Sequence, residues 1–252
     1  MAKATSTPAS LEPLAIGIDI GGTGTKFGIV DRNGNVLFSG RISTKKHKLV
    51  ETFIDELHES LSALIQNGGG SGIIRGIGVG APNGNYYTGT VEYGPNLPWK
   101  GIIPLTQLIQ DKFQLPSILT NDANAAAIGE MEYGAAKGMK DFIMITLGTG
   151  VGSGIVANGH LILGHDGFAG ELGHTIIIPD GRYHEGTGKY GSLESYASAT
   201  GVTITAKEVL EKTRAESLLR KIPPEEIDSK KVYDAAIQGD VLAKEILDYI
   251  GR

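Results

Sequence analysis

The sequence predicts an α/β fold built on a mixed β-sheet, and three observations lead to that prediction. Three short apolar runs near the N-terminus are separated by tight turns, residues 48–65 repeat apolar side chains at helical spacing, and strands and helices then alternate. Neighbouring strands joined by short turns pair antiparallel, whereas strands joined by a crossover helix pair parallel. The expected sheet therefore contains both kinds of pair.

The first part of the predicted sheet lies in "LAIGIDIGGTGTKFGIVDRNGNVLFSGRIST". Ile16, Ile18 and Ile20 fall on one face of an alternating pattern, and the pattern resumes after each of the turns "GGTGT" and "DRNGN". Short glycine-containing turns of this kind join antiparallel strands. We therefore expect the order strand, turn, strand, turn, strand.

Residues 48–65 form the first expected helix. Apolar side chains recur at steps of three and four residues, at Leu49, Phe53, Leu57, Leu61 and Leu64. This spacing turns one apolar stripe toward a core and leaves a carboxylate-rich face toward solvent. The glycines of "NGGGSG" then end the helix.

The rest of the chain continues as strands and helices. We expect a buried strand in "IIRGIGVGAP", a loop with "YGPNLPW", a helix near 104–113, a strand in "SILT" and a helix from about 123 to 136. Two further strands around a glycine turn follow in "DFIMITLGTGVGSGIVANGHLI", so the early pattern is repeated. Helices over about 202–214, 229–238 and 240–250 complete the chain.

The expected organisation is a disordered tail followed by two α/β lobes. The tail covers residues 1–13, the N-terminal lobe residues 14–120, and the larger C-terminal lobe residues 121–252. The first fifteen residues contain a single lysine and no apolar run, so we expect no signal peptide.

Composition narrows the class of protein. The chain has 252 residues, 40% of them hydrophobic, which suffices for a sizeable core. A net charge of −5 provides no basic surface for nucleic acid, and the apolar runs are too short to span a membrane. The absence of cysteine excludes disulfides and thiolate metal sites and is compatible with the cytoplasm, where we expect the protein. These features favour a protein that acts on a small molecule.

The turn in "DIGGTGTK" is the first candidate functional segment. Its glycines can expose backbone N–H groups to an anion, while threonine hydroxyls and one lysine can add donors and charge. The candidate residues for binding phosphate are Gly21, Gly22, Thr23, Thr25 and Lys26. The turn lies between two strands and matches neither the dinucleotide motif nor the P-loop. Its alternative role is that of a plain tight hairpin turn.

A second glycine turn, in "TLGTGVGSG", favours the phosphate interpretation. Gly148, Thr149 and Gly150 repeat the combination of glycines and a threonine in the second half of the chain. Two such turns suit a phosphate chain. Asp19 ends the strand beside the first turn, where a carboxylate would hold a hydrated Mg²⁺, although it could also cap the turn.

Six segments together resemble the ROK family of sugar kinases, specifically its glucokinase-like members, which have the actin-like ATPase (ribonuclease H-like) fold. In chain order they are "DIGGTGTKFGIVD", "GVGAPN", "GPNLPW", "LTNDANAAAIGE", "ITLGTGVGSGIV" and "GELGH", the last followed by a glycine-rich loop and "SLE". The resemblance extends from about Leu14 to Ile250. It implies two lobes, each with a mixed β-sheet and flanking helices.

The resemblance implies that Asp122 of the N-D-A-N segment is the general base of a kinase. Asp122 falls where the strand "SILT" meets a helix, which is a natural edge for a cleft. An aspartate at a helix start is also a common N-cap, and this is the alternative role.

The same resemblance implies a set of sugar ligands. Asn121, Glu171, His174 and Glu194 would bind sugar hydroxyls, with Asn96 and the turn at Gly80 completing the pocket. Carboxylates and amides suit an uncharged hexose, because each hydroxyl both donates and accepts hydrogen bonds. Aromatic residues could supply apolar walls, and the candidates are Tyr86, Tyr87, Tyr93 and Trp99.

The implied activity is transfer of the γ-phosphate of ATP to the 6-hydroxyl of glucose or a related hexose, with Mg²⁺. Other hexoses, such as N-acetylmannosamine, fructose or allose, and polyphosphate as donor remain alternatives, although the "GPNLPW" loop favours glucose. A homodimer is implied as well, and the sequence does not separate it from a tetramer.

Two functions of other classes are alternatives to a kinase. A repressor of the same family would carry a DNA-binding domain before the first strand, for which fifteen residues are too few. A sugar sensor without catalytic activity would share the binding residues. Relatives usually continue by some fifty or more residues beyond this chain, which suggests a fragment or a short form with weak nucleotide binding. Such a chain would expose apolar surface, so we expect poor solubility or compensating association.

Many members of this family hold a structural zinc with the histidine of G-H and three cysteines. Here the corresponding loop reads "YHEGTGKYGSLE". The cysteine positions are filled by residues such as Tyr183 or His184, Glu185 or Gly186, and Ser192, with Glu194 retained. We therefore expect no structural zinc, because these residues make a poor tetrahedral site.

Overall fold

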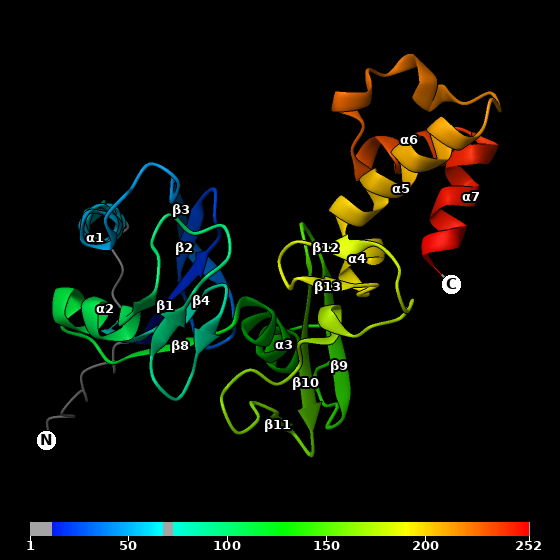
Figure 1. Cartoon of the computed structure of the whole chain (residues 1–252). Helices are drawn as coiled ribbons and strands as arrows, with labels where there is room; N and C mark the ends of the chain where they lie inside the picture. The colour runs from blue at the N-terminus through cyan, green and yellow to red at the C-terminus, as the bar shows by residue number, and fades with distance from the viewer. Residues whose placement is uncertain (1–11, 68–72, 252) are drawn as a thin grey trace, which may run out of the picture. The chain divides into compact units, whose positions relative to one another are not determined.

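The computed structural model describes residues 12–67 and 73–251 (Figure 1). The predicted tail falls mostly on residues 1–11, and the glycines of "NGGGSG" on 68–72, so both lie outside the described residues. The described residues form two compact units, one up to residue 142 together with 156–169 and the other of 143–155 together with the residues from 170 onward. The lobe boundary at residue 120 stays a prediction.

A five-stranded sheet forms the centre of the first unit. Its strands lie in the order β3-β2-β1-β4-β8. They are β1 (Pro13–Ile20), β2 (Thr25–Val30), β3 (Val36–Ile42), β4 (Ile73–Gly80) and β8 (Ser117–Thr120). The pairs β1 with β2 and β2 with β3 are antiparallel, whereas β1 with β4 and β4 with β8 are parallel. The predicted mixed sheet is thus confirmed, with its three antiparallel strands in the expected order.

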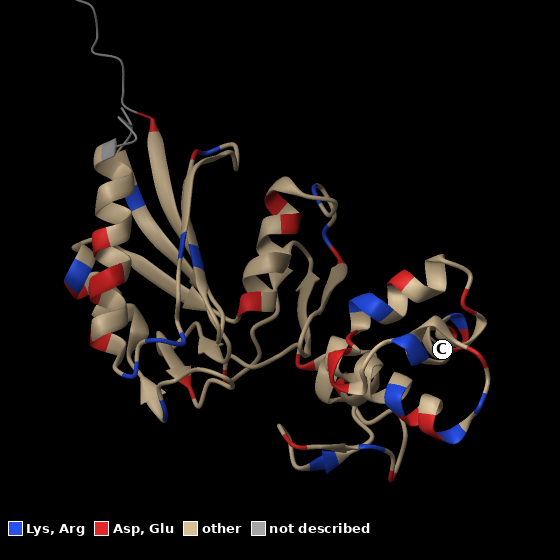
Figure 2. Cartoon of the chain, turned by 90° about the horizontal axis from the view of Figure 1, so that it is seen from above, with Lys and Arg blue, Asp and Glu red and all other residues tan. Residues whose placement is uncertain are grey.

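Three helices and several short strands complete the first unit. The helices are α1 (Val50–Asn67), α2 (Leu105–Phe113) and α3 (Asp122–Tyr133). The short strands are β5 (Gly84–Asn85), β6 (Thr90–Glu92), β7 (Ile102–Ile103) and β11 (His160–Leu161). Figures 1 and 2 show α1 and α3 on opposite sides of the five-stranded sheet.

The second unit is mainly helical beyond residue 193. Two strands contribute residues to both units, β9 (Phe142–Leu147) and β10 (Val151–Ala157). The second unit also contains η1 (Leu172–His174), β12 (Tyr183–His184), β13 (Lys189–Tyr190), α4 (Glu194–Ala197), α5 (Ala199–Lys212), η2 (Leu218–Lys221), η3 (Pro224–Glu226), α6 (Ser229–Ile237) and α7 (Val241–Ile250). The three helices predicted after residue 200 correspond to α5, α6 and α7.

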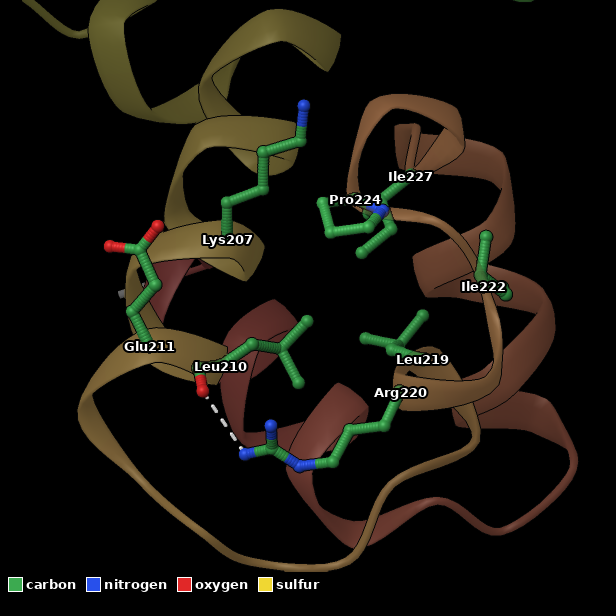
Figure 3. Close-up of a pocket in the computed structure, with 8 residues that line it drawn as sticks. All are labelled: Lys207, Leu210, Glu211, Leu219, Arg220, Ile222, Pro224 and Ile227. Atoms are coloured by element: carbon green, nitrogen blue, oxygen red, sulfur yellow. Dashed lines mark hydrogen bonds between the residues drawn. The ribbon is translucent and has the colours of Figure 1, made fainter.

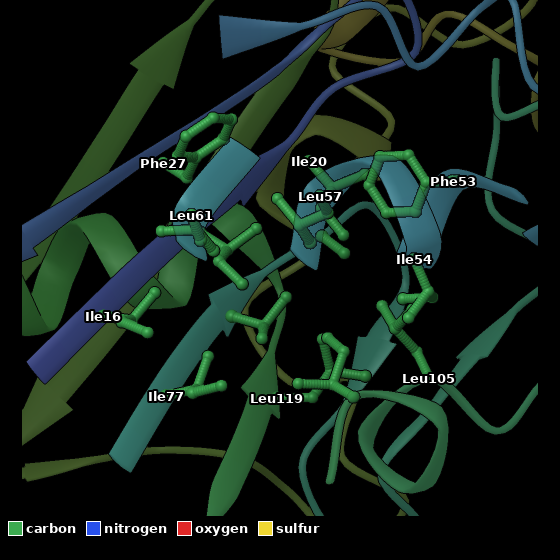
Figure 4. Packing of buried hydrophobic residues seen from close by; sticks show 14 of the residues in the cluster. Ile16, Ile20, Phe27, Phe53, Ile54, Leu57, Leu61, Ile77, Leu105 and Leu119 are labelled. Atoms are coloured by element: carbon green, nitrogen blue, oxygen red, sulfur yellow. The ribbon is translucent and has the colours of Figure 1, made fainter. Parts of the chain in front are cut away.

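The apolar stripe of α1 provides much of the first core (Figure 4). Phe53, Leu57 and Leu61 are fully buried and pack with side chains of the sheet such as Ile16. The prediction for Leu49 was wrong: this residue is 61% exposed, because α1 begins only at Val50. Figure 2 shows several Asp and Glu positions of α1 as red segments of its ribbon.

A separate core holds α5, α6 and α7 of the second unit together. Val202, Leu219, Val232 and Ile246 are among its buried residues. The two units therefore each have apolar side chains packed around their own centre.

One row of cross-strand neighbours runs along the end of the five-stranded sheet. Arg41 pairs with Lys26, Lys26 with Asp19, Asp19 with Gly80, and Gly80 with Thr120. Side chains in such a row point to the same face of a sheet. The row therefore gathers residues from five strands next to the segment that begins at residue 121.

Strand β9 exposes an alternating apolar face. Ile143, Ile145 and Leu147 are 55%, 49% and 66% exposed, and β9 lies at the end of the strand order β11-β10-β9. Exposed apolar residues on an edge strand favour association with other chains. Among the helices of residues 12–67 and 73–251, none has the length and apolar composition to cross a membrane.

Candidate active site

The first glycine turn is closed on itself and packs against the predicted sugar loop. The N–H of Gly21 donates to the carbonyl of Gly24 at 3.1 Å, between the end of β1 and the start of β2. A Cβ atom on Gly22 would lie only 2.6 Å from the carbonyl oxygen of Asn96. Glycine is thus required at 22 for close approach of the two backbones, so the turn and Asn96 form one contiguous surface.

The side chains of the turn do not all face outward. Thr25 is fully buried, and its hydroxyl lies 2.8 Å from that of Thr44 inside the unit. Its side chain therefore stabilises the turn from the interior of the unit. Thr23 and Lys26 are exposed, so they are the side chains of this segment that a ligand can reach.

Arg41 adds a second cation beside this turn, and the sequence interpretation missed it. Its Nε and Nη2 atoms lie 2.8 and 2.9 Å from the place where a Cβ atom on Gly24 would sit. Arg41 is also the cross-strand partner of Lys26. Only the pairing of β2 with β3 reveals this, since 15 positions separate Lys26 from Arg41 along the chain.

The predicted catalytic segment forms the junction between β8 and α3. Asn121 is the N-cap of α3, and its Oδ1 accepts a hydrogen bond from the N–H of Ala123 at 2.8 Å. The Oδ1 of Asp122 accepts from the same N–H at 2.8 Å. Gly80 leaves room for this helix, because a Cβ there would lie 3.2 Å from the Cβ of Ala125.

Desolvation raises the pKa of the Asp122 carboxyl above its ordinary value, and the negative charge of Asp19 raises it further. The hydrogen bond from the N–H of Ala123 acts in the opposite direction but is outweighed. Asp122 nevertheless keeps an exposed surface, so a substrate can reach it. A carboxylate whose proton affinity is raised in this way suits general-base catalysis.

Asn96 lies on a loop held in an unusual conformation. Its φ angle is 61°, in the left-handed region that asparagine tolerates better than most residues. The side chain is exposed next to Gly22. Trp99, a predicted wall of the sugar pocket, is instead a core residue: it is 5% exposed and its ring centroid lies 4.8 Å from that of Phe53.

The second glycine turn is tied to the start of α5. The N–H of Gly148 donates to the carbonyl of Gly150 at 2.9 Å, which closes the turn. The carbonyl of Gly148 accepts from Ala199 N–H at 2.8 Å, and that of Thr149 accepts from the hydroxyl of Thr200 at 3.0 Å. All three predicted residues of this turn therefore have a fixed backbone.

Glu194 lies directly against this turn. Its Oε2 accepts a hydrogen bond from the N–H of Val151 at 2.6 Å, and its Oε1 lies 2.8 Å from Nε2 of His184. A Cβ atom on Gly150 would approach Oε2 to 2.4 Å, so glycine is needed there for the carboxylate to fit. His184, which the sequence interpretation considered only for metal binding, thus contacts a predicted sugar ligand.

The remaining predicted ligands lie around η1 of the same unit. Nδ1 of His174 lies 3.9 Å from Oε2 of Glu171, and both residues are exposed. The His174 ring centroid lies 6.0 Å from that of His184. The second unit therefore groups Glu171, His174 and Glu194 with the turn at Gly150.

The metal-binding capacity of the described residues is limited. Within residues 12–67 and 73–251, no three side chains of His, Asp or Glu are grouped as metal ligands. Hydrated Mg²⁺ needs fewer, since one or two carboxylates suffice beside phosphate oxygens and water. Asp19 fits this requirement: it is exposed, close enough to Asp122 to influence its pKa, and its carboxylate has no hydrogen bond or ion pair to another described residue.

A cavity of about 290 Å³ in the second unit contains none of the predicted site residues (Figure 3). It is lined by Lys207, Leu210, Glu211, Leu219, Arg220, Ile222, Pro224 and Ile227. Arg220 donates to the carbonyls of Leu210, Thr213 and Ala215. The guanidinium is thus engaged by the C-terminal end of α5 and its following loop.

Comparison with known proteins agrees with the fold and the motifs. A model of the ROK family matches residues 15–252. The glucokinase of Halalkalibacterium halodurans is 39% identical over 241 residues, which make up 93% of this chain and 72% of that protein. The glucokinase of Streptomyces coelicolor is 37% identical over 244 residues, 95% of this chain and 74% of that protein.

A solved structure is similar at the level of the fold as well. A ROK family glucokinase from Streptomyces griseus, in complex with glucose and AMPPNP, has a TM-score of 0.74 and 35% sequence identity. The similarity covers 92% of this chain and 74% of that one. The matched family region contains every predicted site residue, from Asp19 to Glu194.

Proposed function

The chain belongs to the ROK family, and from this premise we propose that it is an ATP-dependent glucokinase with Asp122 as general base. Glucokinases 37–39% identical over more than nine tenths of the chain support the activity. The observation that carries the role of Asp122 is its position. It begins α3 beside Gly80 as an exposed residue, and desolvation and the charge of Asp19 raise the pKa of its carboxyl group.

In the proposed reaction, the 6-hydroxyl oxygen of glucose attacks the γ-phosphorus of ATP. The bond from the γ-phosphorus to the bridging oxygen breaks, ADP leaves, and the hydroxyl proton passes to the Asp122 carboxylate. A positioned base of this kind contributes roughly 10²- to 10⁴-fold. The remainder comes from alignment of the two substrates and from stabilisation of the phosphate charge.

We assign phosphate contacts to the residues of each glycine turn, taken within its own unit. Exposed Lys26 and Arg41 supply positive charge at the first turn, and backbone N–H groups around Gly22 and Gly148 supply donors. Mg²⁺, when bound, would neutralise part of the phosphate charge, with Asp19 holding it through water. The analogue AMPPNP in the Streptomyces griseus glucokinase supports ATP as the donor.

The sugar would be bound by polar side chains from several segments. In the first unit we assign hydroxyl contacts to Asn96 and Asn121, beside Gly80, and in the second unit to Glu171, His174 and Glu194. Asn121 retains its side-chain NH₂ as donor, because its Oδ1 is the group used in capping α3. The glucose in the Streptomyces griseus structure supports glucose over other hexoses.

A phosphotransferase assay tests this proposal. The wild-type chain and Asp122→Asn are given ATP or polyphosphate with glucose, N-acetylmannosamine, fructose or allose. Glucose 6-phosphate should form from ATP in the wild type and fall at least about 10²-fold in the variant. Wild-type-like turnover by Asp122→Asn would exclude this residue as the base.

The proposed oligomer is a homodimer. Light scattering at several concentrations measures it directly, and a mass of twice 26.5 kDa is expected. A single species of 26.5 kDa at all concentrations would reject the dimer without bearing on the activity.

A further inference from the structure

We propose that His184 is a positioning residue, which holds the Glu194 carboxylate in the orientation that accepts hydrogen bonds from the sugar. The inference rests on the proposed function, in which Glu194 is a sugar ligand. It concerns a residue outside the set identified from the sequence as binding sugar or phosphate. His184 itself need not touch the substrate.

The geometry shows Glu194 fixed from two directions. Nε2 of His184 lies 2.8 Å from Oε1, and the N–H of Val151 donates to Oε2 at 2.6 Å. The side chains of His184 and Glu194 are 18% and 19% exposed, so water competes only weakly for this contact. A carboxylate has about four acceptor sites, so about two remain for sugar hydroxyls.

The second ring nitrogen of His184 is also engaged. Nδ1 lies 3.1 Å from the hydroxyl oxygen of Thr187. When the Thr187 hydroxyl donates to Nδ1, the imidazole carries its proton on Nε2 and donates that proton to Glu194. The tight turn that brings Thr187 back to the ring is closed by the N–H of Gly188, which donates to the carbonyl of His184 at 2.9 Å.

The hairpin that carries His184 is itself anchored. Arg182, just before β12, donates to the carbonyl of Ser195, to the hydroxyl of Thr205 at 3.0 Å and to Glu208 at 3.1 Å. Its guanidinium also lies 4.7 Å from the ring centroid of Tyr196. Because Arg182 is fixed on α4 and α5, the ring two residues later is presented to Glu194 from a rigid base.

This arrangement predicts a loss of sugar affinity when the His184 contact is removed. Without it, the Glu194 carboxylate can rotate about its side-chain torsions, and binding must then order it. Misplacement of a positioned group by about 1 Å can cost on the order of 10²-fold in catalysis. For His184→Leu we expect KM for glucose to rise about 10- to 100-fold, with KM for ATP unchanged.

The conservative variant separates positioning from bulk packing. The side-chain amide of His184→Gln keeps an N–H donor at nearly the reach of Nε2, so it should restore much of the glucose affinity that His184→Leu loses. His165 serves as the matched control, since its side chain is 99% exposed. His165→Leu and His165→Gln should both leave the two KM values unchanged.

A second measurement needs no turnover. Hydrogen exchange at the amide of Val151 reports whether Glu194 is still held against it, and His184→Leu should speed this exchange relative to the wild type and to His184→Gln. Exchange in α5, α6 and α7 should stay unchanged, which verifies that the unit is folded.

These measurements test the role of His184 and the proposed kinase function independently of each other. If His184→Leu leaves both KM for glucose and Val151 exchange at wild-type values, His184 does not position Glu194. If the wild type phosphorylates no hexose, the proposed function fails, and Val151 exchange alone decides: faster exchange upholds the role of His184, and unchanged exchange overturns it.

Discussion

At the scale of single residues, Asp122 joins two effects that oppose each other. Desolvation and the charge of Asp19 raise its pKa, and they thereby strengthen it as a base while reducing the fraction ionised at low pH. Catalysis requires the ionised form. As the pH is lowered, kcat/KM for glucose should therefore begin to decrease at a higher pH than it would with an aspartate of ordinary pKa.

The acid limb can be assigned to Asp122 by removing one of the two causes of its raised pKa, the charge of Asp19. Asp19→Asn takes away the neighbouring negative charge, so the limb should move to lower pH even if the rate falls with the loss of Mg²⁺ binding. Rate profiles of the wild type and Asp19→Asn over the acid range measure the shift. A limb at the same pH in both would show that another group titrates.

Catalysis requires the ionised Asp122, whereas the folded state is more stable when Asp122 is protonated. A carboxyl group whose pKa is raised on folding stabilises the protein when protonated, and this contribution is lost as pH rises from the unfolded-state pKa through the folded one. Near neutral pH, Asp122→Asn should thus have a Tm equal to or above that of the wild type. The advantage should shrink as the pH falls through the folded-state pKa and be largely gone below about pH 4, and a variant less stable at neutral pH would contradict this account.

Gly22 offers a test of contact between the phosphate turn and the sugar loop. Gly22→Ala would place a Cβ atom 2.6 Å from the carbonyl oxygen of Asn96, so one of the two segments must move. We expect kcat/KM to fall by about tenfold or more. Gly17→Ala is the matched control, because a Cβ there meets no atom within 4 Å. Equal kinetics in the two variants would mean that the loops are not coupled.

At the scale of elements, Asp240 connects α7 to the start of η2. Its Oδ1 accepts from the N–H of Ala243 at 3.0 Å, and its Oδ2 accepts from the hydroxyl of Ser217 at 2.7 Å and from the N–H of Leu218. Burial acts to raise the pKa of Asp240, but the hydrogen bonds outweigh it and the pKa is lowered. The ionised carboxylate is thus the stabilising form.

Asp240→Ala should therefore destabilise the second unit by about 1–3 kcal/mol at neutral pH. Because the folded pKa is lowered, this contribution is present above the unfolded pKa and disappears as pH falls through the folded one. Denaturant unfolding at several pH values should show the difference from the wild type closing below about pH 4. Asp248→Ala, an exposed position on the same helix, should change little.

The elements best predicted from the sequence are those with a long, regular pattern. The stripe at Phe53, Leu57 and Leu61 located α1 to within two residues at each end. Local patterns did not show that Leu49 precedes the helix. Nor did they indicate the short strands β12 and β13, whose residues carry no clear alternation and whose position depends on Arg182 and α5.

Candidate site residues were predictable where a motif is continuous. Asp122 follows directly from the segment around it, whereas Arg41 and His184 reach the site only through strand pairing or a hairpin turn. The sequence also could not predict which threonine of the turn is buried. Thr25 and Thr23 have the same side chain, and only the fold shows that the hydroxyl of Thr25 contacts that of Thr44. Tertiary contacts thus decide which members of a motif face a ligand.

At the scale of the whole molecule, each compact unit has its own apolar core. Such chains often unfold in more than one step. Leu57→Ala in the first unit and Leu219→Ala in the second remove fully buried side chains, each at a cost of about 2–5 kcal/mol. Calorimetry should show each variant lowering a different transition, and Leu49→Ala, at an exposed position, lowering neither. A single transition that both variants shift equally would mean that the units unfold together.

The row from Arg41 to Thr120 also bears on where the chain can change in length. The register shifts of the sheet lie away from this row, between Leu14 and Ile16 on β1 and between Ile29 and Val30 on β2. A bulge can take up an added or lost residue locally. Insertions near those bulges should be tolerated, whereas one residue added inside β2 between Thr25 and Lys26 would place these two side chains on the same face of the sheet and break the row. Length variation among descendants of this sequence should accordingly gather at the bulged ends of the strands.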